Sequence, residues 1–449
     1  MAKARFSRIG FILAAAGAAV GLGNIWKFPY ITGMYGGGAF VSIYLITVAL
    51  IGFSLLAGEM LVGYKGGKDA VSSFEIVAPE GKKGWKYAGF MLFSGLIIMT
   101  FYSVVIGWIF HYIYLSVTNS LPTDINQAKD TFDNLVQFSP GIATLWHFLA
   151  TVFVAIVLLG GIKAGIEKAN LILMPLLLAI LVGLLGYAMS FDGFDKALHF
   201  MFAPDWSKIN SEAIVRAVGH AFFTLSIGIG TMVTYAASMS HKQSVFKAAM
   251  WVTILDTLIA LVAGVMIYSF IFEYGASAAQ GPGLVFKTLP IVLTKMGTTG
   301  VAISIVFFLA LAFAGLTSAI SLTEPAVEYF IQRFHFSRVK SVVLNTSLYF
   351  IVGIGAILSY TKEYGKTFSI GDKPLFDALE FSTDSILLPL GGLAIAIFVG
   401  YVLKEQEREH IVKHQVNYTI YKIWLFSLKF VAPVAIIFMM LNNFGIIKI

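Results

Sequence analysis

The segment Gly17 to Pro29 reads GAAVGLGNIWKFP and lies inside the first apolar run of a chain of 449 residues. Glycine and asparagine favour turns and helix ends over the middle of a helix. Three glycines and an asparagine stand here where a run starting near residue 10 reaches the centre of a bilayer. The segment therefore predicts a helix that is interrupted halfway across a membrane.

The composition outside this segment excludes an ordinary soluble protein. Hydrophobic residues make up 58% of the chain and charged residues only 12%, against about 25% charged in soluble domains. There is no cysteine, so disulfides and thiolate metal sites are excluded. The net charge of +7 is spread over many short loops, which argues against nucleic-acid binding and leaves the lipid bilayer as the expected partner.

Apolar runs long enough to cross a membrane recur along the whole chain. We therefore expect an all-α integral membrane protein with about eleven transmembrane helices, forming a single domain over residues 1–449. The predicted spans are 10–35, 39–63, 88–117, 142–161, 167–189, 211–240, 244–273, 299–332, 340–359, 378–403 and 420–442.

Alternate loops differ in their content of lysine and arginine, with about twice as many on one side. The positive-inside rule then places the N-terminus in the cytoplasm and the C-terminus outside, in a cytoplasmic (inner) membrane. The basic start followed by a small-residue apolar run also fits a signal peptide. We interpret it as the first span, because it contains the interrupted segment.

A second interruption occurs five spans later, where residues 222–231 read FFTLSIGIGT. Irregular backbone at membrane depth is tolerated only where it is buried in protein or lines a cavity. Two interruptions in corresponding positions of two halves are described for transporters, where freed carbonyls hold cations and helix N-termini hold anionic groups. The alternative is glycine used only for close helix packing. We favour a binding site, because the interruptions are paired.

Together these segments resemble the neurotransmitter:sodium symporter family, which has the leucine-transporter (LeuT-type) fold. The similarity runs from about residue 5 to the last span and rests on GAAVGLGNIWKFP at 17–29, FFTLSIGIG at 222–230 and AGLTS at 314–318. Gly165 and Pro175 match the family's fifth-helix motif, associated with unwinding and sodium release. The resemblance implies a prokaryotic eleven-helix member with inverted repeats at 10–189 and 211–403, helix 11 at 420–442, and helices 1 and 6 unwound.

By resemblance, two sodium sites and a substrate site fall on residues of these motifs. The first sodium site would use Ala19, Asn24, Thr224 and Asp256. The second would use Gly17, Val20, Ala314, Thr317 and Ser318. The amino-acid substrate would meet Ala19, Leu22, Gly23, Ile98, Tyr102, Phe223, Thr224, Ser226, Ile229, Ser318 and Leu322. From the residues alone, Thr317 and Ser318 equally fit hydroxyls bonded back to their own helix, and Tyr102 fits an ordinary packing residue.

Asp256 departs from the leucine-transporter pattern, which has asparagine there. A carboxylate in an apolar span is expensive and suggests a cation as its partner. Its fixed negative charge would replace the chloride of chloride-dependent members, and Ala260, one turn on, offers no hydroxyl to chloride. We therefore expect two sodium ions and no chloride; proton antiport through the same carboxylate is an open alternative.

The gates also differ from the family pattern. Lys27 replaces the usual arginine of the outer gate, with Glu380 as its expected partner and Asp377 or Asp384 as alternatives. The inner gate is assigned to Arg5 and Tyr235, although Gln332 stands where an acid is expected. Two other intramembrane acids, Glu59 and Glu324, are expected to form structural hydrogen bonds. The loop 275–299 is either an extracellular lid or a surface loop with a short helix.

The resulting function is sodium-coupled symport of a small amino acid by alternating access, in a monomer or homodimer. Ile229 is smaller than the phenylalanine common in the family, which favours a hydrophobic or aromatic side chain. Another amine or a betaine is the alternative substrate. An ion channel would need a continuous polar pore, and an enzyme would need a nucleophile beside a base; the sequence indicates neither.

Overall fold

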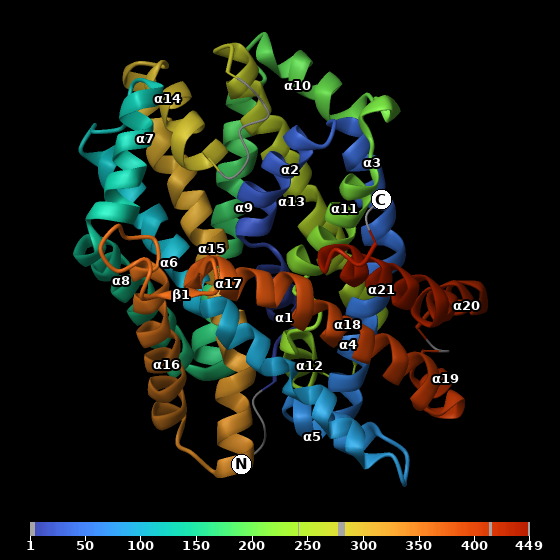
Figure 1. Cartoon of the computed structure of the whole chain (residues 1–449). Coiled ribbons are helices and arrows are strands. Elements are labelled where there is room, and N and C mark those ends of the chain that lie inside the picture. The colour runs from blue at the N-terminus through green and yellow to red at the C-terminus, as the bar shows by residue number, and fades with distance from the viewer. Residues whose placement is uncertain (1–4, 241, 277–282, 413–414, 448–449) are drawn as a thin grey trace.

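The computed structural model describes residues 5–240, 242–276, 283–412 and 415–447, and these are mostly helical (Figure 1). The helices of the first half are α1 (Arg8–Ala19), α2 (Phe28–Met34), α3 (Gly38–Thr47), α4 (Phe53–Gly66), α5 (Ala70–Val77), α6 (Leu92–Val117), α7 (Ile125–Asp133), α8 (Pro140–Leu159), α9 (Lys168–Ala188) and α10 (Gly193–Phe202). Those of the second half are α11 (Ser211–Thr224), α12 (Thr231–Ala236), α13 (Val245–Glu273), α14 (Leu289–Thr294), α15 (Thr298–Phe334), α16 (Arg338–Leu358), α17 (Leu375–Ser382), α18 (Leu388–Ile397), α19 (Glu405–Val412), α20 (Tyr418–Phe426) and α21 (Ala432–Asn443).

Shorter segments connect or interrupt these helices. The π-helical ones are Gly23–Lys27, Val48–Gly52, Asn134–Phe138, Gly161–Glu167, Leu284–Thr288, Thr383–Leu387, Phe398–Val402 and Ser427–Val431. Lys83–Met91 and Trp206–Lys208 are 3-10 helices. The strands β1 (Ser369–Ile370) and β2 (Lys373–Pro374) form a small antiparallel hairpin that the sequence did not predict.

Within the described residues, nine helical runs are long and apolar enough to cross a membrane. A tenth consists of α1 with the segment Gly23–Met34, bent by 49° at a break. The predicted sixth span is two short helices, α11 and α12, and neither is long enough alone. The predicted helical membrane architecture is thus confirmed, apart from the small hairpin, while the number of eleven spans stays a prediction.

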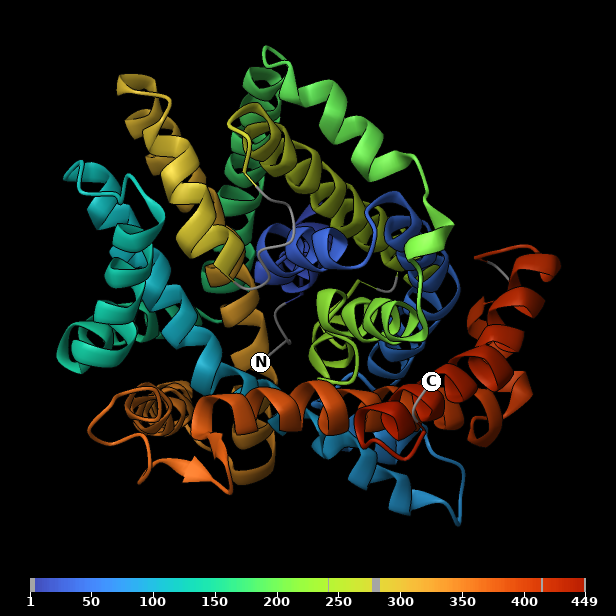
Figure 2. The ribbon, with the colours of Figure 1, turned by 45° about the horizontal axis from the view of Figure 1, so that its top comes forward.

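The buried share of each span differs between the helices at the centre of the bundle and those at its periphery. The apolar window of the span containing α6 is 83% buried, whereas that of the span containing α9 is 28% buried. Large apolar side chains of α9 such as Ile172 and Val182 are 51% and 63% exposed, which fits contact with lipid rather than water. In Figure 2 the blue α1 and the yellow-green α11 lie near the centre and other helices surround them.

The loop 275–299 contains short helices at the end of the bundle opposite the N-terminus (Figure 1). Leu284–Thr288 and α14 form its second half, with Phe286 and Leu289 buried. Residues 277–282, which include the predicted loop residues Gly281 and Pro282, lie outside the described residues. The described part therefore has the short helix that the sequence allowed.

Candidate functional site

The first interruption lies where the glycine-rich segment predicted it. Helix α1 ends at Ala19, and Val20 turns to an extended conformation with ψ of 107°. The amide of Gly21 donates to Asn24 Oδ1 at 2.9 Å, so a side chain takes the place of a helical carbonyl. The backbone then re-enters a helix at Gly23. The break exposes backbone oxygens and amides in the middle of the protein.

The second interruption follows Thr224, the last residue of α11. Ser226, Gly228 and Gly230 all have positive φ (52°, 82° and 79°), a region that L side chains rarely adopt. The amide of Gly228 donates to Glu59 Oε1 at 2.6 Å, so the buried acid of α4 holds this turn. The predicted structural hydrogen bonding of Glu59 is confirmed.

The two interruptions are in direct contact. Ser226 Oγ donates to the carbonyl of Ala18 at 2.7 Å, and Ser318 Oγ of α15 approaches the same carbonyl at 3.5 Å. A Cβ on Gly23 would lie 3.1 Å from the ring of Phe223, so only glycine fits there easily. Three elements, α1, α11 and α15, therefore meet at one point.

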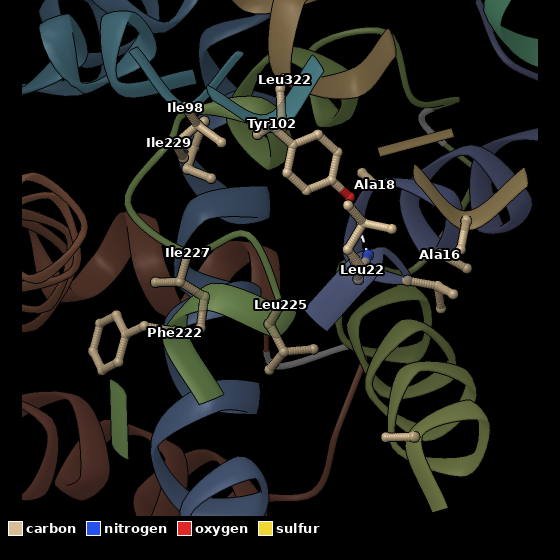
Figure 3. Close-up of a cluster of buried hydrophobic side chains, with 14 of the residues drawn as sticks. Ala16, Ala18, Leu22, Ile98, Tyr102, Phe222, Leu225, Ile227, Ile229 and Leu322 are labelled. Carbon is tan, nitrogen blue, oxygen red and sulfur yellow. Dashed lines mark hydrogen bonds between the residues drawn. The ribbon is translucent and has the colours of Figure 1, made fainter. Parts of the chain in front are cut away.

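A small central cavity occupies this meeting point. It has room for about one water molecule, with a volume of ≈ 10 Å³. Figure 3 shows Ile98, Ile229, Leu322 and Tyr102 gathered on one side. The residues around it are Ala19, Gly21, Gly23, Ile98, Tyr102, Phe223, Thr224, Ser226, Ile229, Ser318 and Leu322. This set contains every predicted substrate residue except Leu22, whose amide instead donates to Tyr102 Oη at 3.0 Å.

The side chains predicted for the first sodium site are brought together beside this cavity. Asn24 Nδ2 donates to Asp256 Oδ1 at 2.7 Å, and Thr224 Oγ1 donates to both carboxylate oxygens, at 3.0 and 3.1 Å. All three residues are buried. Among the described residues, no ion pair neutralises Asp256. The cluster is a buried carboxyl group with further oxygen atoms around it, which are the ligands that a small cation prefers.

The residues predicted for the second sodium site lie where α1 packs on α15. A Cβ on Gly17 would lie 3.2 Å from the Cβ of Thr317. The hydroxyl of Thr317 donates to the carbonyls of Phe313 and Ala314, at 3.0 and 3.1 Å, so it bonds back to its own helix as the alternative interpretation allowed. Val20 and Ala314 are fully buried. The five residues thus come from two touching helices.

A larger cavity of ≈ 430 Å³ adjoins the central one, and Tyr102 and Phe223 line both. Lys27 stands at this boundary, with its Nζ 4.3 Å from the centre of the Phe223 ring. Its Nζ lies 2.5 Å from Asp384 Oδ2 and 3.9 Å from Glu380 Oε1. Glu380 and the alternative Asp384 are therefore both within ion-pair distance, and Asp384 has the shorter contact. The other alternative, Asp377, accepts from Tyr360 Oη at 2.5 Å.

At the other end of α1, the N-terminal segment packs against α12. Phe6 is 3% exposed, and its ring centre lies 5.4 Å from that of Tyr235. Tyr235 Oη donates to Ser321 Oγ at 2.9 Å. Arg5 is exposed at this end. The contact with Tyr235 in the structure is made by Phe6, the residue after Arg5.

The predicted unwinding motif begins in the π-helical segment Gly161–Glu167 and continues into α9, which contains Pro175. A Cβ on Gly165 would collide with the carbonyl of Val157, so the close turn between α8 and α9 requires glycine. The motif is thus located at a tight, irregular turn.

Sequence reasoning missed two polar contacts near this turn. Ser7 Oγ donates to Glu167 Oε1 at 2.5 Å, which joins the start of α1 to the start of α9. Arg338 donates to both carboxylate oxygens of Glu324, at 3.0 and 2.6 Å, and to the carbonyl of Leu158 at 2.6 Å. The hydrogen bonding of Glu324 was predicted, but its partner was not, because the two residues meet only after α16 folds back on α15.

Comparison with known proteins gives one consistent result. The family model described as the sodium:neurotransmitter symporter family matches residues 4–134 and 134–448. The chain is 32% identical to the uncharacterized sodium-dependent transporter YhdH of Bacillus subtilis, covering 98% of both chains. It is 24% identical to the sodium-dependent nutrient amino acid transporter 1 of Drosophila mojavensis, covering 82% of this chain and 67% of that one.

A solved structure, MhsT in complex with L-phenylalanine, is similar over 98% of this chain and 100% of that chain, with 37% identity and a TM-score of 0.89. With the family model covering nearly the whole sequence, the chain is a member of the sodium:neurotransmitter symporter family.

Proposed function

We propose that this sodium-dependent symporter carries an amino acid with an apolar or aromatic side chain, together with two sodium ions and without chloride. The observation that supports this most directly is the contact of Asn24 and Thr224 with Asp256 at the edge of the central cavity. A buried carboxylate without a cationic partner in the described residues is stabilised by a cation that joins it during the cycle, or by taking up a proton, which keeps proton antiport as the alternative.

In this proposal the first sodium ion binds among Ala19, Asn24, Thr224 and Asp256. The amino acid would then enter the central cavity with its carboxylate toward the first interruption, where Tyr102 Oη and the amide of Leu22 already meet at 3.0 Å. Because sodium and substrate share one site, each raises the affinity of the other by the same factor. Coupling thus follows from proximity of the two ligands.

The substrate proposal rests on the apolar wall of the cavity. Ile98, Ile229 and Leu322 form one side of it, and an apolar wall favours an apolar side chain. The similar protein MhsT was solved with L-phenylalanine, which supports an aromatic substrate here. Another amine or a betaine stays the alternative substrate.

The second sodium ion is assigned to Gly17, Val20, Ala314, Thr317 and Ser318, between α1 and α15. Its binding would hold α1 against α15, and its loss would let the inner half of α1 move. The gates of this cycle are Lys27 with Asp384 and Glu380 on the outer side, and the N-terminal segment with Tyr235 on the inner side. We assign the N-terminus to the cytoplasm and the C-terminus to the outside of an inner membrane, in a monomer or homodimer with repeats 10–189 and 211–403.

The test is uptake into proteoliposomes of the purified chain with each of twenty amino acids, with and without sodium and chloride gradients. We expect sodium-stimulated uptake of apolar or aromatic amino acids that is the same with gluconate in place of chloride. Substitution Thr224→Val should weaken sodium stimulation, while Thr346→Val, a buried threonine bonded back to Val342 in α16, should leave it unchanged. Uptake that requires chloride, or that ignores sodium, would contradict the proposal.

A further inference from the structure

One oxygen of the Asp384 carboxylate lacks a hydrogen-bond partner among the described residues. Asp384 lies in the π-helical segment Thr383–Leu387, between α17 and α18. Its Oδ2 contacts Lys27 Nζ at 2.5 Å, whereas its Oδ1 is buried and unpaired. A lysine ammonium is a compact point charge, while an arginine fork can bind both oxygens of a carboxylate. The carboxylate of Asp384 therefore has a free position for a second donor.

Asp384 lines a further cavity of ≈ 250 Å³, which we name the side cavity. The side cavity lies between α2, α11, the segment Thr383–Leu387 and the end of α21. Two of its lining side chains, Arg216 and His220, can donate hydrogen bonds and lie one turn apart on α11. Lys27 also lines it, so the side cavity adjoins the outer gate proposed above. The unpaired carboxylate and two candidate donors therefore share one cavity.

Arg216 is bonded in this structure to an exposed partner. Its Nη2 lies 3.2 Å from Glu212 Oε1, one turn back on the same helix, and Tyr35 Oη donates to the same oxygen at 2.8 Å. The side chains of Arg216 and Glu212 are 56% and 51% exposed. An exposed ion pair at this helical spacing contributes about 0.3–0.5 kcal/mol. Arg216 can therefore leave Glu212 at little cost, and the side cavity gives its long side chain room to turn inward.

His220 is less suited to be the second donor. It is 2% exposed, and its ring centre lies 5.8 Å from that of Phe28 and 5.3 Å from that of Tyr44. This packing restricts rotation of the ring. Arginine carries a permanent charge on a flexible side chain, so it can both reach a carboxylate and neutralise it. The geometry therefore favours Arg216.

We propose that Arg216 is a second cation of the outer gate, whose guanidinium crosses the side cavity to Asp384 Oδ1 when the gate closes over bound substrate. Lys27 then binds Oδ2 and Arg216 binds Oδ1. In this way α11 supplies a guanidinium that position 27 lacks. The proposal rests on the function proposed above, because that function makes Lys27 and Asp384 a gate.

The contact would join the gate to the second interruption. Arg216 lies on α11 about two turns before Thr224, where that interruption begins. Phe223 and Thr224 border the central cavity, so a substrate in this cavity touches the helix that carries Arg216. The rate at which substrate leaves to the outside should therefore depend on whether Arg216 binds Asp384.

The experiment is a double-mutant cycle on Arg216→Gln and Asp384→Asn. The quantity measured is the rate at which labelled substrate, the amino acid found by the uptake screen, dissociates to the outside after dilution. Glu212→Gln is the matched control, because it breaks the ion pair that Arg216 makes in this structure and leaves Arg216 in place. Arg216→Lys is the conservative variant, which keeps the charge and lacks the fork. Thermal unfolding checks that each variant is folded.

Arg216→Gln should speed dissociation by about three- to fivefold, the effect of one ion pair at a partly exposed carboxylate. In the Asp384→Asn background the same substitution should add less than about twofold, because its partner is already absent. Arg216→Lys should give a rate between those of the unmodified chain and Arg216→Gln. Glu212→Gln should leave the rate within about twofold of that of the unmodified chain.

Equal effects of Arg216→Gln in both backgrounds would overturn the proposal, as would no effect, or the same effect from Glu212→Gln. If Arg216→Gln does not fold, Arg216→Lys with and without Asp384→Asn completes the cycle. Absence of sodium-stimulated binding of every amino acid by the unmodified chain would instead defeat the proposed function, and this proposal with it.

Discussion

Asn24 donates two hydrogen bonds to Asp256 through one nitrogen: 2.7 Å to Oδ1 and 2.9 Å to the backbone carbonyl, across 232 positions of sequence. Since Asn24 Oδ1 accepts from the amide of Gly21, the amide group is fixed at both ends. The first interruption is thereby attached to α13 at the carboxylate. Any change in the charge of Asp256 must therefore alter the hydrogen bonds that hold the backbone of the first interruption.

Asp256→Asn should raise the external sodium concentration for half-maximal uptake by about tenfold, which corresponds to ~1.4 kcal/mol. Because the substitution removes the charge and keeps the size of the side chain, the loss of sodium affinity measures the electrostatic contribution of the carboxylate. The measurement is uptake at varied sodium in proteoliposomes. Asp69→Asn is the control: Asp69 is also fully buried, but it caps α5, a position where asparagine is equally good. An unchanged sodium constant in Asp256→Asn would remove Asp256 from the sodium site.

Gly17→Ala should abolish sodium-dependent uptake and lower the melting temperature, because its Cβ would collide with Asn170 and crowd Thr317. Gly183→Ala tests the same chemical change in α9, where no atom lies within 4 Å of the added Cβ. That variant should be as stable as the unmodified protein or more stable, by up to about 1 kcal/mol of helix propensity. Thermal unfolding in detergent and uptake give the two readouts. Equal behaviour of the two variants would contradict the close packing of α1.

The two acids near Lys27 should differ in importance. Asp384→Asn should speed dissociation of bound substrate to the outside by about tenfold, since it removes the 2.5 Å contact. Glu380→Gln should have a smaller effect, of about twofold, because its oxygen is 3.9 Å from Nζ and 44% of the side chain is exposed. The measurement is loss of labelled substrate after dilution. The reverse order would identify Glu380 as the main partner of Lys27.

Arg338→Gln should destabilise the protein by about 3 kcal/mol, because it leaves the fully buried carboxylate of Glu324 unpaired. The double variant with Glu324→Gln should regain part of that loss, since both charges are then gone. Arg333→Gln, on the exposed end of α15, is the control and should stay within ~0.5 kcal/mol. Thermal unfolding of the four proteins gives the comparison. A double variant less stable than Arg338→Gln would show that the pair is not the cause.

The sequence predicted those features of the fold and the site that follow from a short stretch of residues. The break after Ala19 could be expected from glycine and asparagine in an apolar run, and the residues of the central cavity from matched motifs. Leu22 lies beside the larger adjoining cavity, and its amide donates to Tyr102 Oη. The resemblance assigns this amide and this hydroxyl to the substrate carboxylate, and that assignment stays a prediction.

Contacts between elements that are distant in the sequence could not be predicted in the same way. Nothing in the spacing of Lys27, Glu380 and Asp384 decides which acid is nearer, because one helical turn separates the two acids and the rotation of α17 sets their distances. The contact of Ser7 with Glu167 joins residues 160 positions apart.

The central cavity, with room for about one water molecule, has a consequence for how affinity should be interpreted. An amino acid enters only if the surrounding side chains move apart, so each measured dissociation constant contains the cost of widening the chamber. Two ligands that make the same contacts will have different dissociation constants if one of them requires a wider cavity than the other. The preference for one substrate over another then depends on two quantities. One is the free energy needed to move the side chains of Phe223, Tyr102 and Ile229 apart, and the other is the contacts that these side chains make with the substrate.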